Sequence, residues 1–128
     1  MEEAPRSYLL VFVGAGLGGV LRHGVNVLVP RWGVALSHGT LFVNVAGSLL
    51  AGLVSGYFAF RGEGTPLLRL FLMTGILGGF TTFSAFSVDV VLLFERGELA
   101  AAATYAVGSV VFSVAATLLG LWLARLVA

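Results

Sequence analysis

The stretch GILGGFTTFSAFS, residues 75–87, decides the fold of this chain. Within it, the adjacent glycines Gly78 and Gly79 are followed closely by the threonines Thr81 and Thr82. Flexible glycines and β-branched residues are poor helix formers, so together they predict a break in a helix. Inside a membrane, a broken helix exposes backbone carbonyls and amides that protein, water or an ion must satisfy.

The residues around this stretch are apolar enough for most of the chain to lie in lipid. Hydrophobic residues make up 59% of the 128 residues, charged residues make up 10%, and the mean hydropathy is +1.04. Four apolar spans cover about residues 8–29, 39–60, 67–94 and 99–123. At ~1.5 Å per residue, each can cross a hydrocarbon core of ~30 Å. The sequence therefore predicts an all-α membrane protein, one four-helix transmembrane domain over residues 1–128, with the third helix broken at its centre.

The distribution of charges does not fix the orientation of these spans in the membrane. All seven basic residues are arginines, four on the side of both termini and three on the other side. The positive-inside rule needs a clear bias to fix an orientation. Two interpretations stay open: an ordinary protein with a weak signal, or insertion in both orientations, which would let two copies associate antiparallel. The chain has no basic tract for nucleic acid and no cysteine for a disulfide or a thiolate metal site.

Polar residues within the spans form three stripes, each on one helix face because its members recur every four residues. Small residues and hydroxyls at this spacing fit either close helix packing or a polar pathway. None of the stripes carries a carboxylate, and their hydroxyl, amide and guanidinium donors favour a small anion. Asp89, towards the end of the third span, could snorkel or cap polar backbone. The stripes are Gly14, Gly18, Arg22 and Asn26; Thr40, Asn44 and Ser48; and Tyr105, Ser109, Ser113 and Thr117.

Two phenylalanines, Phe83 and Phe86, lie three residues apart just beyond the predicted break. Their rings share one helix face, and a ring edge is weakly positive and can approach an anion. The stretch thus predicts carbonyls for a cation beside rings suited to an anion. The glycines of GAGLGG, residues 14–19, match a dinucleotide-binding pattern, but helix packing explains them because no βαβ unit fits there. No nucleophile–base pair occurs, so no enzyme is predicted.

With these motifs the chain resembles the Fluc (CrcB) family of fluoride channels over essentially its whole length. The resemblance rests on GAGLGGVLRHGV at residues 14–25, GTLFVNVAGS at 39–48, GILGGFTTFSAFS at 75–87 and YAVGSVVFS at 105–113. It implies an antiparallel, dual-topology homodimer in the inner membrane of a prokaryotic cell, with two fluoride pores and one structural sodium ion at its centre. Such channels export cytoplasmic fluoride passively and so confer fluoride resistance.

The resemblance also implies which residues form these sites. The paired rings of the family match Phe83 and Phe86, and the carbonyls that hold sodium match Gly78 and Thr81. The second-span asparagine of the family matches Asn44. The fluoride pathway is expected to comprise Asn44, Phe83, Phe86, Tyr105, Ser109, Ser113, Thr40, Thr82 and Arg22.

Three positions depart from the pattern common in that family. Ala85 stands where a threonine is frequent, Asp89 where glutamate is usual, and His23 where tyrosine is common. The alternative interpretation is a four-helix, dual-topology multidrug transporter. That class needs a membrane-embedded glutamate in its first helix to exchange protons for cations, and the first span here has no acid.

Overall fold

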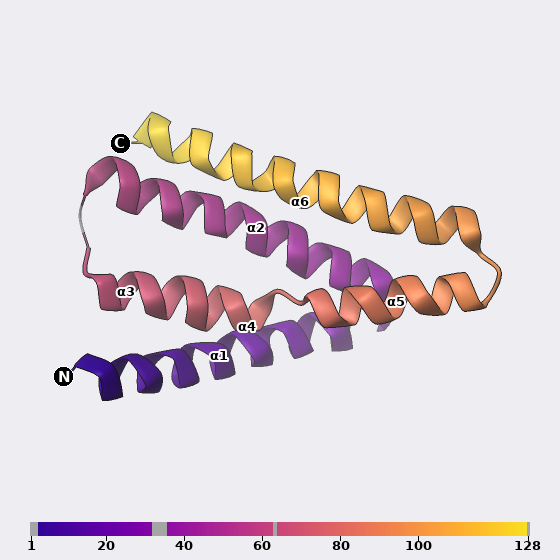
Figure 1. The fold of residues 1–128 in the computed structure, drawn as a ribbon, viewed down its shortest axis with the longest axis horizontal. Coiled ribbons are helices and arrows are strands. Elements are labelled where there is room, and N and C mark those ends of the chain that lie inside the picture. The colour runs from indigo at the N-terminus through magenta and orange to yellow at the C-terminus, as the bar shows by residue number, and fades with distance from the viewer. Residues whose placement is uncertain (1–2, 32–35, 63, 128) are drawn as a thin grey trace.

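The computed structural model describes residues 3–31, 36–62 and 64–127, and every regular element within them is a helix. Both termini lie at one end of the molecule, next to the connection between the second and third spans (Figure 1). The elements are α1 (Glu3–Arg31), α2 (Leu36–Arg61), α3 (Pro66–Leu70), the π-helical η1 (Phe71–Leu77), α4 (Gly78–Phe80), α5 (Phe83–Glu95) and α6 (Leu99–Val127).

Four helical segments are long and apolar enough to cross a membrane: Ala4–Val29, His38–Arg61, Pro66–Glu95 and Leu99–Val127. Their outer faces carry large exposed apolar side chains, such as Tyr8 at 80% and Phe12 at 78%. Lipid is the solvent that makes such exposure favourable. The all-α, four-span membrane fold with a broken third helix is therefore confirmed, and the helices extend up to five residues beyond the ranges drawn from hydropathy.

The third span breaks at its threonines, and the glycines before them remain helical. Thr81 (φ −84°, ψ 157°) and Thr82 (φ −149°, ψ 122°) are extended, whereas Gly78 (φ −62°, ψ −37°) continues the helix. The Thr82 hydroxyl then accepts from the Ala85 amide at 3.1 Å and so caps α5. The sequence predicts the break from the glycines and the threonines together, whereas the structure places it at the threonines alone. Glycine is needed at position 79 because a Cβ there would overlap the Ala15 carbonyl oxygen of α1.

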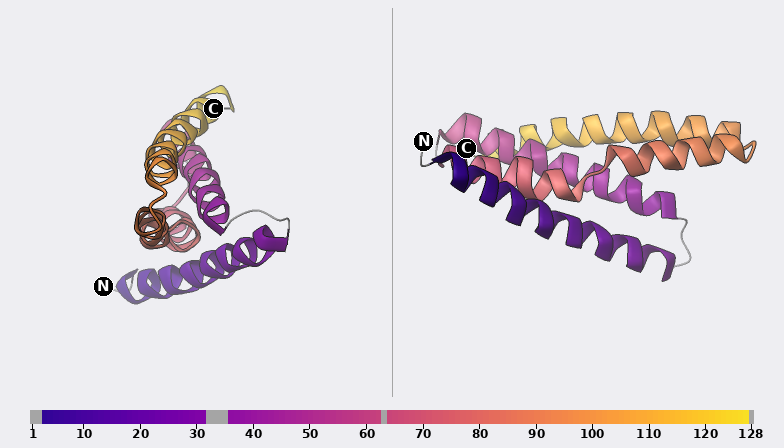
Figure 2. Two further views of the ribbon diagram at one scale, coloured as in Figure 1. Left: turned by 90° about the vertical axis from the view of Figure 1, so that its right-hand side faces the viewer. Right: turned by 60° about the horizontal axis from the view of Figure 1, so that its bottom comes forward.

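The helices pack as two close pairs, α2 with α6 and α1 with η1 and α4 (Figures 1 and 2). Gly52 of α2 faces the Thr117 carbonyl, and Gly120 of α6 faces the Leu49 carbonyl. In the other pair, Gly18 of α1 lies directly against the Ile76 carbonyl. Glycine lets helix backbones touch, which gives dispersion and weak Cα–H···O contacts where lipid supplies no hydrophobic drive.

This packing predicts opposite outcomes for two neighbouring glycines of α1. Gly18→Ala should lower the thermal unfolding temperature in detergent by at least 5 °C, because its Cβ would overlap backbone atoms at Ile76. Gly19→Ala is the matched control, since a Cβ at Gly19 meets no described atom within 4 Å beyond its own helix backbone. Alanine favours helix over glycine by about 1 kcal/mol, so Gly19→Ala should be neutral or stabilising. Equal effects of the two substitutions would contradict the packing.

Candidate ion site at the helix break

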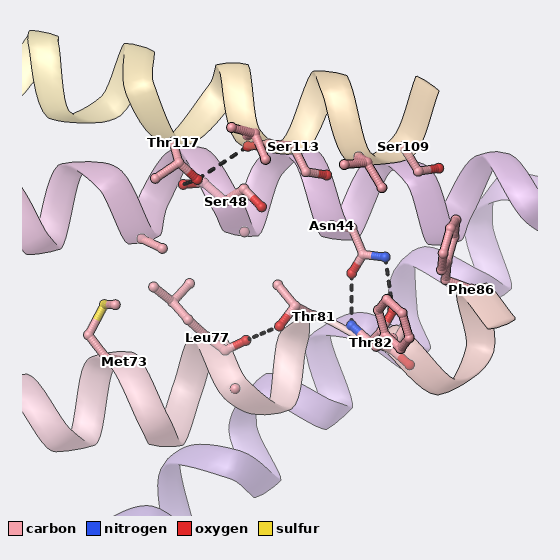
Figure 3. Close-up of a pocket in the computed structure, with 16 residues that line it drawn as sticks. Asn44, Ser48, Met73, Leu77, Thr81, Thr82, Phe86, Ser109, Ser113 and Thr117 are labelled. Atoms are coloured by element: carbon pink, nitrogen blue, oxygen red, sulfur yellow. Dashed lines mark hydrogen bonds between the residues drawn. The ribbon is translucent and has the colours of Figure 1, made fainter. Parts of the chain in front are cut away.

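A pocket of about 470 Å³ opens beside the break, between α2, α6 and the third span. Figure 3 shows its polar side chains reaching inward from all three elements. Its described lining residues include no Asp or Glu. The polar lining comprises Asn44, Ser48, Thr81, Thr82, Ser109, Ser113 and Thr117, and the apolar lining includes Leu77, Phe83 and Phe86.

The side chain of Asn44 pairs with the backbone of Thr82 in both directions. Its Nδ2 donates to the Thr82 carbonyl at 2.9 Å, and its Oδ1 accepts from the Thr82 amide at 2.8 Å (Figure 3). The asparagine side chain therefore supplies the hydrogen bonds that the N–H and C=O of Thr82 would make in a continuous helix. Because an amide has two N–H donors, Asn44 keeps a second N–H beyond the one used here.

The break also removes the α-helical donors from the carbonyls of two residues that line the pocket. An α-helical carbonyl accepts from the amide four residues later. For Gly78 that amide belongs to Thr82, which donates to Asn44 instead. For Thr81 it belongs to Ala85, which donates to the Thr82 hydroxyl. These are the two carbonyls that the sequence resemblance named for a cation.

Aromatic rings continue from the break along α5 towards α6. The ring centroids of Phe83 and Phe86 are 5.5 Å apart, and those of Phe86 and Tyr105 are 5.4 Å apart. At the far end, the Tyr105 hydroxyl donates to Asp89 Oδ2 at 3.0 Å. The carboxylate of Asp89 thus accepts from a tyrosine hydroxyl, a partner that the sequence does not predict. Thr40, only 4% exposed, contacts the same Tyr105 hydroxyl.

One buried hydroxyl in the pocket has no protein partner among the described residues. Ser109 is 5% exposed, and its Oγ makes no hydrogen bond there. A buried hydroxyl without a partner costs free energy, so it is suited to a bound water or anion. Higher along α6, the Thr117 hydroxyl donates to the carbonyls of Ser48 and Ser113 at 3.1 and 3.2 Å. Ser48 and Thr117 are outside the expected fluoride pathway but line the pocket, and their four-residue spacing from Asn44 and Ser113 is the signal that places them on the same helix faces.

Not all of the expected pathway residues meet in this pocket. Asn44, Thr82, Phe83, Phe86, Ser109 and Ser113 line it. Tyr105 lies beyond it and packs against the ring of Phe86, and Thr40 contacts the Tyr105 hydroxyl. Arg22 lies on the opposite side of the third span, where its Nε donates to the Gly79 carbonyl at 3.1 Å.

The fold and this pocket define a small multi-pass membrane protein with a polar pocket at a helix break, whose described lining holds no carboxylate. Across residues 3–31, 36–62 and 64–127, no group of three His, Cys, Asp or Glu side chains could hold a metal. A cation at the break would therefore depend on backbone carbonyls, and an anion on hydroxyl, amide and ring-edge groups.

The chain belongs to the CrcB family, because the family model described as "CrcB-like protein, Camphor Resistance (CrcB)" matches residues 9–121. This confirms the resemblance found in the sequence. A protein of Nitrobacter hamburgensis named "Fluoride-specific ion channel FluC 2" is 55% identical over 93% of this chain and 97% of its own length. Proteins named "Fluoride-specific ion channel FluC" from Rhodopseudomonas palustris and Granulibacter bethesdensis are 54% and 57% identical over 93% of this chain. They cover 97% and 94% of their own lengths, respectively.

Proposed function

We propose that this protein is a fluoride-selective, passive ion channel that exports fluoride across the inner membrane. The observation that carries the proposal is identity above one half, over nearly the full length, to relatives named as fluoride-specific channels. The multidrug-transporter alternative has no support of this kind. Its required acid is also missing from the first span.

The chemistry of the pocket supports passage of a small anion. Fluoride holds its water strongly, so a pathway must offer hydrogen-bond donors in place of that water. The unused N–H of Asn44 and the unpartnered hydroxyl of Ser109 are two such donors. The rings of Phe83 and Phe86 add weakly positive edges without any formal charge. Asp89, the nearest acid along the ring chain, is held by Tyr105 outside the pocket.

Fluoride efflux from liposomes that contain only this purified protein tests the proposal. Liposomes loaded with fluoride should release it rapidly once an ionophore dissipates the charge imbalance, because the channel itself moves charge. Parallel liposomes loaded with chloride should retain it. A fluoride electrode and a chloride electrode measure the two release rates. Equal release of the two ions, or none of either, would reject a fluoride-selective channel.

We also propose that two copies associate antiparallel as a dual-topology homodimer with sodium at its centre. The near-balanced arginines support two orientations, and the carbonyls of Gly78 and Thr81, freed from their helical donors, fit a hard monovalent cation. A pair of carbonyls from each copy would supply four oxygens to the ion. Terminal tags found on both faces of the cell membrane would support this assembly, and tags found on one face alone would reject it.

A further inference from the structure

An arginine of the first span reaches across to the backbone of the third span. Arg22 is half-buried, and its Nε donates to the Gly79 carbonyl at 3.1 Å, although the two residues are 57 positions apart. A charged side chain within a membrane span is costly and requires a partner. The partner of Arg22 is the backbone carbonyl of Gly79, next to the break.

Close glycine contacts between α1 and the third span determine the position of the Arg22 guanidinium. Gly18, one turn before Arg22, lies against the Ile76 carbonyl, and Gly79 lies against the Ala15 carbonyl. With no side chain between them, the backbones of α1 and α4 are in contact. The arginine therefore meets the end of α4 as a consequence of how the two helices pack.

Gly79 lies on the α1 side of the third span, whereas its neighbours in the break lie on the pocket side. Gly78, Thr81 and Thr82 line the pocket on the side of α2 and α6, and Gly79 does not. Carbonyls in the last turn of a helix lack intrahelical donors, so Gly79 would otherwise be one more unpaired acceptor beside the break. The bond from Arg22 satisfies it from the α1 side.

We infer that Arg22 is a positioning residue, which occupies the Gly79 carbonyl and thereby leaves Gly78 and Thr81 as the cation acceptors of the break. The inference rests on the proposed sodium site. Because a cation and a guanidinium repel each other, the arginine also keeps the ion on the pocket side of the third span. Arg22 then acts through the backbone and not as part of the fluoride pathway.

Sodium dependence of stability tests this role apart from flux. Thermal unfolding of the purified, detergent-solubilised protein is followed while sodium is replaced by N-methylglucamine, and the sodium concentration for half-maximal stabilisation is measured. Arg22→Met should raise that concentration at least tenfold, and Arg22→Lys, which keeps the charge but lacks the Nε donor, should fall in between. Arg125→Met is the matched control, since Arg125 stacks over Phe60 away from the break, and it should stay within twofold of the wild type.

Amide hydrogen exchange over residues 78–83 gives a second measurement that does not require sodium. Faster exchange there in Arg22→Met, with unchanged exchange in α6, is expected. If the wild type itself shows no sodium dependence, the proposed sodium site fails and the exchange result alone decides the role of Arg22. A wild-type sodium requirement together with wild-type exchange in Arg22→Met overturns the inference, whatever happens to fluoride flux. If Arg22→Met does not fold, the same two measurements on Arg22→Lys decide.

Discussion

Asn44→Leu is expected to reduce fluoride flux at least a hundredfold and to destabilise the protein. The change keeps the size of the side chain but removes both hydrogen bonds to Thr82, at 2.9 and 2.8 Å. Each stranded backbone group in a dry interior costs about 1–3 kcal/mol, so the two together should cost about 2–6 kcal/mol. The extended backbone at the break then loses its main anchor, and the pocket loses an N–H donor. Initial efflux rates and thermal unfolding in detergent measure the two effects.

Asn26→Leu is the matched control because Asn26 is the other asparagine of the chain. Its Oδ1 is buried without a hydrogen-bond partner among the described residues. Replacing it by leucine therefore leaves no described donor without its acceptor. We expect its unfolding temperature and its flux to stay close to wild type. Near wild-type flux and stability in Asn44→Leu would show that the break holds without this amide.

The second large effect is expected from replacing the two phenylalanines beyond the break. Both replacements should lower fluoride flux, but they should differ in how far they lower the unfolding temperature. Phe83→Ile should lower fluoride flux at least tenfold, because it removes a positive ring edge from the pocket. Phe83 is 76% exposed in the single chain and has one ring contact, with Phe86, so its unfolding temperature should fall less than that of Phe86→Ile. Phe86 packs against both Phe83 and Tyr105. Phe86→Ile should therefore also lose two ring contacts, each worth about 0.5–1.5 kcal/mol. Isoleucine keeps the apolar character in both cases but removes the positive ring edge.

Phe12→Ile controls for the loss of an exposed ring, because Phe12 of α1 is 78% exposed on the outer surface. Its flux and its unfolding temperature should match those of the wild type. Efflux assays and thermal unfolding on all three variants check this difference. Wild-type flux in both Phe83→Ile and Phe86→Ile would refute a role for ring edges in conduction.

The sequence was sufficient to predict the four spans because lipid imposes length and apolarity on every residue of a spanning helix. The break was also predictable, since Thr81 and Thr82 disfavour helix locally. The contribution expected from Gly78 and Gly79 is not seen, because both remain helical. Gly79 instead lets the backbone of Ala15 approach closely, a use that membrane helices often make of glycine. Local propensity cannot reveal that contact. The π-helical segment η1 was not predicted from the sequence either.

The partners of the site residues could not be predicted, because they depend on which helices become neighbours. The bond from Asn44 to Thr82 joins residues 38 positions apart. The bond from Arg22 to Gly79 requires α1 to pack on the third span, whereas a simple up-and-down order would place it mainly on α2. Four-residue spacing therefore indicated which residue types line the pocket. It could not show that Arg22 lies on the other side of the third span from the other pathway residues.

The long separation between Arg22 and Gly79 has a consequence for how the chain is made. Translation proceeds at about 5–20 residues per second, so Gly79, 57 positions after Arg22, is added about 3–11 s later. For most of that interval the first span is complete, but the carbonyl that will accept from Arg22 has not yet been made. The nascent helix must hold Arg22 near water or within the insertion machinery until the third span arrives. Pausing of the ribosome between these two codons would lengthen that exposure, whereas pausing after codon 79 would not.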